Sequence, residues 1–562
     1  MVSASLLIMS VAGATYTVLL NSSHVKSSLG YDQTTLTLLS FFKDVGSNVG
    51  LLSGLIHKVT RPWVVLLIGA AMNFSGNFMI WLAVTGKLAK PSVWQMCLYI
   101  CVGATSHSFF NNGALVTCVE NFPEGRGIVL DLLKGFVEIG SAILTQLYHA
   151  IYGDNSKSLI LLIAWLPAAL PFIFLWTIRN MKTVPQTNEV MVFYNLRYIS
   201  VDLAGFLMFR IIVQNRTSFS RIEYGASFGV VLVLLFTPLL FVMQEQLKAW
   251  KANKQVLDGS SSQYVNSQVP EGIENPPPPA AVEPEGSNRP AGDLKSSKKT
   301  DSCRNNAFLP QDQGEDYTIL QALFSIHMII LFVATTCGVG GTLTAIDNLG
   351  QIGLALGYPA STATTFISLM SIWKYLGRVV SGFTSETFLS KYKFPRPLMF
   401  SLMLLLSCFG HLLIAFGVPN SLYVASVIIG FSFGAQWQLL FAIISEIFDL
   451  KYHFTLYYFG ALASLVGMYI LNVKVAGRLY DQEALKQMEA KGLKRLNGEE
   501  LTCTGVECYK KAFIVITAAT LFGCVVSLVL VLIHRKFREQ ADPAAAEAGQ
   551  ALQVQTVTGQ MG

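Results

Sequence analysis

The segment GGTLTAIDNLGQIGLALGY, residues 340–358, decides the fold because its pattern already occurs near the start of the chain. Residues 13–31, GATYTVLLNSSHVKSSLGY, share its first glycine, a threonine and an asparagine at the same spacing, and end on the same Leu-Gly-Tyr. Further matched positions follow at nearly the same offset: Ser106, Glu120 and Phe122 with Ser432, Glu446 and Phe448. Two sets of matches at nearly equal offsets predict a duplicated structural unit.

The composition is that of a membrane protein. Of the 562 residues, 52% are hydrophobic and only 13% are charged, about half the share of charged residues in soluble proteins. Uncharged apolar runs such as 159–178 and 512–533 reach the roughly 20 residues that a helix needs to cross a bilayer. We therefore predict an all-α polytopic membrane protein. The net charge of +6 belongs to loops and tails, where it favours contact with lipid head groups over nucleic acid.

Apolar length and turn residues predict two sets of six spans with two extra spans between them. The spans lie near 4–21, 34–56, 63–85, 93–119, 128–152 and 158–179, then near 198–214 and 224–243, and finally near 320–346, 362–383, 397–417, 421–447, 455–476 and 511–533. They divide the chain into an N-terminal half at 1–180, an extra pair at 181–243 and a C-terminal half at 318–538. Several transporter folds are built from such internal repeats.

Two polar segments are predicted to be disordered, because they cannot bury a hydrophobic core. They are a cytosolic linker at 244–317, which contains four consecutive prolines at 276–279, and a tail at 539–562. The linker is either a plain tether between the halves or a regulatory segment, and no particular protein partner is predicted.

The positive-inside rule predicts a cytosolic N-terminus, because the short loops on that side then carry most of the lysine and arginine. The loop at 474–511 disagrees, since it would lie outside and is also rich in basic residues. Cys503 and Cys508 share this loop, and the sequence leaves open whether they form a disulfide. The apolar start of the chain lacks the basic region of a cleaved signal peptide, so we predict a retained first helix.

A distinctive loop follows the second span of the C-terminal half. It contains, in order, Gly377, Arg378, Ser381, Gly382 and Glu386, and then a basic run that ends at Arg396. A glycine followed four residues later by an acid and then by basic residues resembles the signature loop of the major facilitator superfamily. In such a loop the glycine lets two helices approach, and the acid meets a helix N-terminus or an arginine across the interface between the halves.

The first half has a weaker copy of this loop. Gly54 matches the glycine, but Lys58 stands where the acid is expected, so the copy is degenerate. The residues predicted to form the gating loop are therefore Gly54, Gly377, Arg378, Gly382 and Glu386.

Further motifs resemble the plant nodulin-like, nuclear-fusion-defective-type branch of that superfamily. They are Leu29-Gly30-Tyr31, Ser53-Gly54, Asn121–Gly127, Ala204–Met208 and Ile212–Asn215. The resemblance covers nearly the whole chain apart from the linker and tail. It implies a major facilitator-type bundle of two pseudo-symmetric six-helix halves plus two extra helices. It implies almost nothing about the substrate, although this branch is distantly similar to monocarboxylate and oxalate/formate transporters.

Charged residues inside spans cost about 2.5–3.5 kcal/mol each on insertion scales, so they mark functional candidates. Asp131, Lys134 and Glu138 share one face of the fifth span, where they either pair within the helix or face a cavity. Lys43 and Lys374 lie in similar Ser-x-x-Lys-x-x-Gly patterns of the two second spans. Lysines that face a central cavity favour an anionic substrate such as a small carboxylate, whereas lysines that reach the membrane interface say nothing about transport.

Amide side chains form another set of candidates in the two fourth spans. They are Asn111, Asn112, Gln436 and Gln438. These side chains either bind a substrate at the membrane midplane or make ordinary hydrogen bonds between helices.

Together these features predict a secondary active transporter that works by alternating access on a small organic solute. The sequence has no Gly-x-x-x-x-Gly-Lys-Ser/Thr phosphate loop, so the energy would come from an ion gradient, most simply protons. The predicted proton carriers are Asp44, Asp131, Glu138 and Asp347. The alternative is a non-transporting scaffold or receptor with a transporter fold. We predict no enzyme, cofactor or metal site, because no cluster of suitably spaced ligands or catalytic side chains is found.

Overall fold

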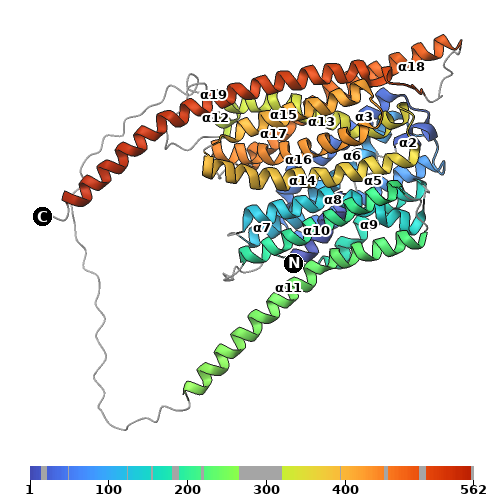
Figure 1. Ribbon diagram of the computed structural model, residues 1–562. Helices are drawn as coiled ribbons and strands as arrows, with labels where there is room; N and C mark the ends of the chain where they lie inside the picture. Colours follow the sequence, from blue (N-terminus) through green and yellow to red (C-terminus); the bar gives the residue numbers. More distant parts are fainter. Residues whose placement is uncertain are drawn as a thin grey trace, which may run out of the picture. The chain divides into compact units, whose positions relative to one another are not determined.

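The computed structural model describes residues 1–13, 22–48, 50–122, 125–153, 156–179, 189–216, 221–264, 319–392, 394–448, 453–492 and 501–558. Within these ranges the chain forms helices joined by short turns and contains no strand (Figure 1). The chain divides into a unit of Met1–Pro238 with Gln313–Gly562 and a second unit of Leu239–Asp312, of which the structure describes residues 239–264. Every candidate site residue lies in the first unit.

Where the structure describes them, the predicted spans of the N-terminal half fall on helices. These are α1 (Val2–Ala12), α3 and α4 (Gln33–Asn48, Leu51–Val59), α5 (Pro62–Val84), α6 with the π-helical turn η2 and α7 (Val93–Phe110, Asn111–Val116, Thr117–Asn121), α8 (Arg126–Tyr152) and α9 (Ser156–Phe174). The short α2 (Ser22–Leu29) precedes α3. The second predicted span is divided into α3 and α4 near Gly50, and the first is described only as far as residue 13.

The predicted spans of the extra pair and of the C-terminal half also coincide with helices. The helices are α10 (Glu189–Arg216), α11 (Arg221–Tyr264), α12 (Ile319–Leu323), α13 (Ile326–Ala355), α14 (Ala360–Tyr392), α15 (Arg396–Phe416), α16 (Ser421–Ile447), α17 (His453–Gly467), the π-helical η4 (Met468–Gly477), α18 (Arg478–Ala490) and α19 (Glu507–Thr558). α11 and α19 continue past the predicted ends of their spans, and residues 265–318 of the predicted linker lie outside the described residues.

The fifth span of the C-terminal half is longer than predicted. Its helix does not end near residue 476 but runs from α17 through η4 and α18 to Ala490. Lys474, Arg478 and Lys486, which we assigned to a loop, therefore belong to a helix. The polar composition of α18 hid this extension, because apolar length was the signal for a span.

The duplicated segments have the same backbone conformation at their ends. Gly30 and Gly357 both adopt positive φ angles, 63° and 85°, which an L side chain rarely adopts. Tyr31 and Tyr358 each donate their backbone N–H to the carbonyl oxygen five residues earlier, at 3.1 and 3.0 Å. This arrangement is a helix C-cap with glycine as the left-handed residue. The repeat seen in the sequence is thus a repeat in structure.

Close helix contacts also recur between the halves. A Cβ atom on Gly13 of α1 would lie 2.0 Å from the backbone oxygen of Val137 on α8, and Gly140 of α8 approaches α1 as closely. A Cβ atom on Gly340 of α13 would lie 2.6 Å from the Cα atom of Gly467 on α17. The first and fifth spans of each half therefore touch through matching glycines.

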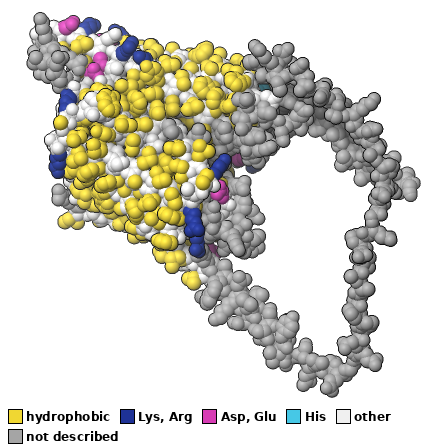
Figure 2. Space-filling model, turned by 180° about the vertical axis from the view of Figure 1, so that it is seen from behind, with side chains coloured by type: hydrophobic (Ala, Val, Ile, Leu, Met, Phe, Trp, Pro, Cys, Tyr) yellow, Lys and Arg dark blue, Asp and Glu magenta, His cyan; other side chains and the backbone are white. Residues whose placement is uncertain are grey.

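The surface and the helix lengths fit an integral, multi-pass membrane protein. Among the described residues, eight helices are long and apolar enough to cross a membrane. Hydrophobic side chains cover most of the face seen in Figure 2, and lysine and arginine gather toward its edges.

The two halves meet along two equivalent pairs of helices. α8 of the first half packs along α14 of the second (Figure 1), and α3 of the first half packs along η4 and α17 of the second. Each half therefore contributes its second and fifth spans to the interface. The fold is the expected major facilitator-type bundle of two pseudo-symmetric halves with two extra helices.

Candidate functional site

A cavity of about 170 Å³ lies between the two halves. Most of the residues predicted to be functional line its wall: Lys43, Asp44, Asn111, Asp131, Lys134, Glu138, Asp347, Lys374, Arg378 and Gln438. Asn112, Gln436, Gly54, Gly377, Gly382 and Glu386 are not part of the wall. The structure thus brings together side chains from both halves that are hundreds of residues apart in sequence.

One ion-pair cluster joins α3 to α13. The ammonium group of Lys43 lies 2.8 Å from Oδ1 of Asp347 and 3.5 Å from Oδ1 of Asp44. All three side chains are buried. The lysine therefore faces the cavity and not the membrane interface.

A second cluster joins α8 to α14. Glu138 accepts from Lys374 at 3.2 Å and from Arg378 at 3.4 Å, through its two carboxylate oxygens. The hydroxyl groups of Ser141 and Ser371 also hydrogen-bond across this seam. Glu138 is therefore paired with the opposite half and not, as one alternative held, within its own helix.

The two lysine patterns occupy equivalent positions. A Cβ atom on Gly46, three residues after Lys43, would lie 2.4 Å from the backbone oxygen of Cys101 on α6. A Cβ atom on Gly377, three residues after Lys374, would lie 2.1 Å from the backbone oxygen of Phe431 on α16. Each second span thus uses its glycine to approach the fourth span and directs its lysine into the cavity.

Two charged groups of the wall stand outside these ion pairs. Lys134 donates to the amide oxygen of Asn111 at 3.3 Å, and Asp131 lies near the side-chain amide of Gln438. Neither has an oppositely charged partner within 4.0 Å among the described residues. They are the charges that an occupant of the cavity could engage without breaking an existing ion pair.

The two predicted asparagines are the first two residues of the π-helical turn η2, but their side chains have different partners. Asn111 begins the turn and faces Lys134. Asn112 instead donates to the hydroxyl of Ser53 at 2.6 Å and to the carbonyl oxygen of Gly50 at 3.5 Å. Asn112 therefore makes hydrogen bonds between the fourth and second spans, the second of the two roles expected for it, and does not line the cavity.

Gln436, the other amide predicted to bind substrate, also does not line the cavity. It is completely buried, and its amide oxygen lies 3.6 Å from where a Cβ atom of Gly338 on α13 would be. Its neighbour two residues on, Gln438, lines the cavity. The two amides point in different directions because residues two apart on a helix do not share a face.

The acid of the predicted gating loop lies at a helix N-terminus, the first of the two partners expected for it, because Arg396 is the first residue of α15. Glu386 contacts Arg396 at 2.9 Å, and Arg396 also approaches Glu446 at 3.7 Å. All three residues belong to the C-terminal half, so the acid does not reach across the interface. A Cβ atom on Gly382 would lie 3.6 Å from Oδ2 of Asp131, which is ordinary contact, and Gly54 has open space around it.

At the side predicted to be outer, α18 connects to the opposite half. Oδ1 and Oδ2 of Asp481 accept from the backbone N–H groups of Gln33 and Thr34, both at 2.9 Å. These donors are at the start of α3, so Asp481 caps that helix. The side chain of Gln33 also donates to Asn348 at 2.9 Å, which continues the contact between the halves.

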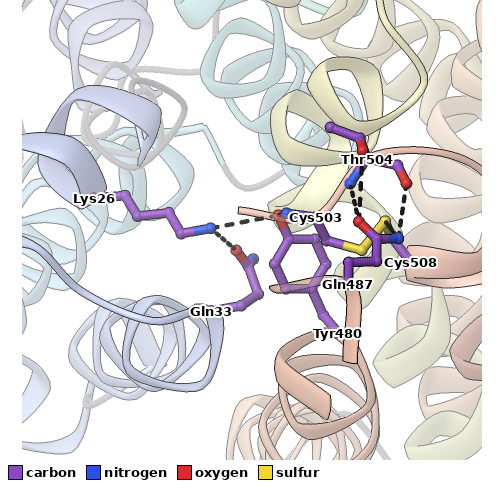
Figure 3. Close-up of a disulfide and its surroundings, with 7 residues drawn as sticks. All are labelled: Lys26, Gln33, Tyr480, Gln487, Cys503, Thr504 and Cys508. Carbon is purple, nitrogen blue, oxygen red and sulfur yellow. Dashed lines mark hydrogen bonds between the residues drawn. A yellow bond between two sulfur atoms is a disulfide. The ribbon is translucent and has the colours of Figure 1, made fainter. Parts of the chain in front are cut away.

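A disulfide between Cys503 and Cys508 supports this contact (Figure 3). The backbone N–H of Cys503 donates to the hydroxyl of Tyr480 at 3.1 Å. Lys26 of the first half donates to the same hydroxyl at 3.5 Å and lies 4.7 Å from the centre of the tyrosine ring. The disulfide loop, α18 and the first half therefore meet at one tyrosine.

Sequence reasoning missed an aromatic part of the cavity wall. Phe433, Trp437 and Phe441 of α16 and Tyr457 and Tyr458 of α17 all line it. The spacing of four residues between the first three was a visible signal for one helix face. It was not used because aromatic residues are common throughout membrane helices.

Comparisons with known proteins agree with this architecture. The Nodulin-like family profile matches residues 1–243, and that of the NFD4 C-terminal domain matches residues 314–539. The Arabidopsis thaliana protein NUCLEAR FUSION DEFECTIVE 4 is 25% identical over 91% of this chain and 84% of its own length. Probable transporter MCH1 of Yarrowia lipolytica is 24% identical over 36% of this chain and 41% of its own.

A solved structure supports the fold. The inward-open xylose transporter XylE from E. coli aligns with a TM-score of 0.50 at 11% identity, over 94% of this chain and 95% of that one. At such low identity the likeness concerns the fold alone.

Proposed function

We propose that this chain, which belongs to the nodulin-like, nuclear-fusion-defective-type branch of the major facilitator superfamily, carries small carboxylate anions together with protons. The observation behind the proposal is that two charged side chains in the cavity between the halves are not part of an ion pair. Lys134 and Asp131 line that cavity, while the other charges of its wall are held in ion pairs. A secondary active transporter with alternating access would use such a site.

Lys134 would bind the substrate carboxylate. Its ammonium group has one uncharged partner, Asn111, and a carboxylate would add a charge-assisted hydrogen bond, which is about twice as strong as a neutral one. The side-chain amides of Asn111 and Gln438 lie on the same wall and can supply further donors. A neutral solute would gain much less from the lysine.

The charge balance of the wall favours a proton as the coupling ion. The wall has four cations, Lys43, Lys134, Lys374 and Arg378, and four carboxylates, Asp44, Asp131, Glu138 and Asp347. A bound anion would leave one net negative charge in a poorly solvated space, which is costly. Protonation of Asp131, the carboxylate outside the ion pairs, removes that charge. One proton would then travel with each monovalent anion.

Transport by the purified, full-length protein in liposomes tests the proposal. We expect labelled acetate, lactate or pyruvate to exchange by counterflow, and an external pH below the internal pH to drive accumulation above that of protein-free liposomes. Absence of exchange for every carboxylate would contradict the proposed function. Exchange that ignores the pH gradient would contradict only the coupling to protons.

Two substitutions separate binding from coupling. Asp131→Asn imitates the protonated carboxyl group, so counterflow should continue while the pH gradient no longer drives accumulation. Lys134→Gln should raise the half-saturating carboxylate concentration about tenfold or more, because a hydrogen bond to a charged group is worth about 1.5–3 kcal/mol. Glu507→Gln and Lys157→Gln remove exposed charges away from the cavity and serve as matched controls.

The scaffold alternative depends on the predicted linker. Deleting residues 250–310 should leave carboxylate exchange intact in a transporter. A chain that shows no exchange before or after the deletion, and whose cellular role is lost with the linker, would favour the scaffold.

A further inference from the structure

We infer that the cavity is built for a carboxylate attached to a single aromatic ring, which defines the substrate class more narrowly than the proposed function on which it rests. The inference concerns the five rings that line one side of the cavity, which we call the aromatic wall: Phe433, Trp437, Phe441, Tyr457 and Tyr458. No charge pairing or gating contact described above involves these side chains.

The rings form one continuous surface. Centroid separations are 6.2 Å between Phe433 and Trp437, 5.9 Å between Trp437 and Tyr457, and 5.4 Å between Tyr457 and Phe441. Each of these pairs meets edge to face, a favourable geometry that leaves ring faces and edges available for a further ring. The wall comes from α16 and α17 and is therefore held by the C-terminal half.

Two polar atoms in the wall lack hydrogen-bond partners. The ring N–H of Trp437 and the hydroxyl of Tyr457 make no hydrogen bond to a described residue, and neither atom is sealed from solvent. Tyrosine and tryptophan usually satisfy these groups when buried. Their position on the cavity wall lets them meet an occupant or the water around it.

The aromatic wall adjoins the charged part of the cavity. The ammonium group of Lys374 lies 5.6 Å from the ring centroid of Phe433, within the range of a cation–π contact. The carboxylate-binding candidates Lys134 and Asn111 lie on α8 and η2, in the opposite half. A ligand that spans both halves therefore needs an anionic end and an apolar, preferably aromatic, end.

The size of the cavity limits that apolar end to one ring. A cavity of about 150 Å³ lined by apolar side chains is known to bind benzene, and this one measures about 170 Å³. Benzoate-sized acids fit this volume, whereas two-ring acids exceed it unless the walls move. Acetate would fill the charged end only and leave the aromatic wall uncovered.

Binding to the purified, full-length protein in detergent tests the inference without the passive leakage of weak acids across membranes. Isothermal titration should give benzoate and phenylacetate affinities at least about tenfold above acetate, because even one methylene group in a hydrophobic pocket changes selectivity by about 10–200-fold. Benzyl alcohol, which has the ring without the charge, and 1-naphthoate, which has two rings, should bind more weakly than benzoate.

The outcomes distinguish the two proposals. Equal affinities for acetate and benzoate, or a preference for 1-naphthoate, would overturn the aromatic assignment and leave carboxylate transport standing. Binding of neither acid, together with absence of carboxylate counterflow, would overturn both.

A substitution in the wall locates the effect. Trp437→Leu should abolish the preference for benzoate over acetate while acetate binding remains. Trp373→Leu is the matched control, because Trp373 meets Phe431 edge to face outside the cavity, and it should retain the preference. Retained preference in Trp437→Leu would overturn the assignment. Equal loss of benzoate and acetate binding in a Trp437→Leu protein that remains monodisperse would also overturn the assignment.

Discussion

At the scale of single residues, Glu138 is the carboxylate whose removal should lower the free energy of unfolding most. It pairs with Lys374 at 3.2 Å and Arg378 at 3.4 Å, and all three side chains are largely buried. Glu138→Gln leaves two cations without their carboxylate, which should destabilise the fold by about 3–5 kcal/mol. We expect a lower thermal unfolding midpoint in detergent, and partial recovery when Lys374→Met removes one of the two cations as well.

Glu386→Gln provides the control for this effect. Glu386 also pairs with an arginine, Arg396, at 2.9 Å, but its side chain is 72% exposed. Exposed ion pairs contribute about 0–1 kcal/mol, so the unfolding midpoint should hardly change. Similar losses for Glu138→Gln and Glu386→Gln would contradict the importance that we assign to burial at the interface between the halves.

At the scale of elements, α18 is expected to hold the outer side closed. Asp481 caps α3 of the opposite half through two backbone N–H groups, and the loss of a cap costs about 0.5–2 kcal/mol. Asp481→Ala should therefore shift the population of states toward opening on that side by up to about thirtyfold. A cysteine at Ser47, which lines the cavity, should then react faster with a membrane-impermeant thiol reagent added from outside.

This labelling experiment needs a defined background and control. Every cysteine other than Cys503 and Cys508 is replaced by alanine, so that only the reporter at Ser47 reacts. Glu489→Ala removes an acid from the same helix at a position that is exposed, and should not change the rate. An unchanged rate in Asp481→Ala would mean that the cap does not limit opening.

The disulfide should act on the same element through Tyr480. Replacing Cys503 and Cys508 by serine leaves the loop less restrained and weakens the hydrogen bond from residue 503 to the tyrosine hydroxyl, which is 3.1 Å long. We expect faster labelling of the reporter at Ser47, in the same direction as Asp481→Ala but smaller, because the cap itself remains. Slower labelling would show that the loop favours the open state.

The elements and the cavity charges could be predicted from the sequence, but their partners could not. Glycines at helix contacts repeat because any side chain would collide there, so Gly13 and Gly340 revealed the duplication. Charges in spans revealed the cavity because membrane burial is costly. That Lys43 pairs with Asp347 depends on how the halves pack, which local periodicity does not encode. Asp481 was assigned to a loop for a different reason: α18 is polar, and apolar length was the signal for a span.

At the scale of the whole molecule, alternating access requires the halves to move against each other as units. Ser141 of α8 and Ser371 of α14 hydrogen-bond across their interface, so cysteines at these two positions should form a disulfide on oxidation. In the cysteine-replaced background, we expect oxidation to stop carboxylate counterflow and a dithiol reductant to restore it. The background without the two added cysteines is treated with the same reductant as a control, because the reductant also reaches the Cys503–Cys508 disulfide.

A pair inside one half shows whether the interface is the moving boundary. Ser401 of α15 and Ser527 of α19 hydrogen-bond at 2.9 Å within the C-terminal half, and cysteines there should cross-link without affecting counterflow. If oxidation of this second pair also stopped exchange, transport would require rearrangement inside the C-terminal half. If neither cross-link affected exchange, α8 and α14 would stay together throughout the cycle, and the boundary between moving parts would lie elsewhere.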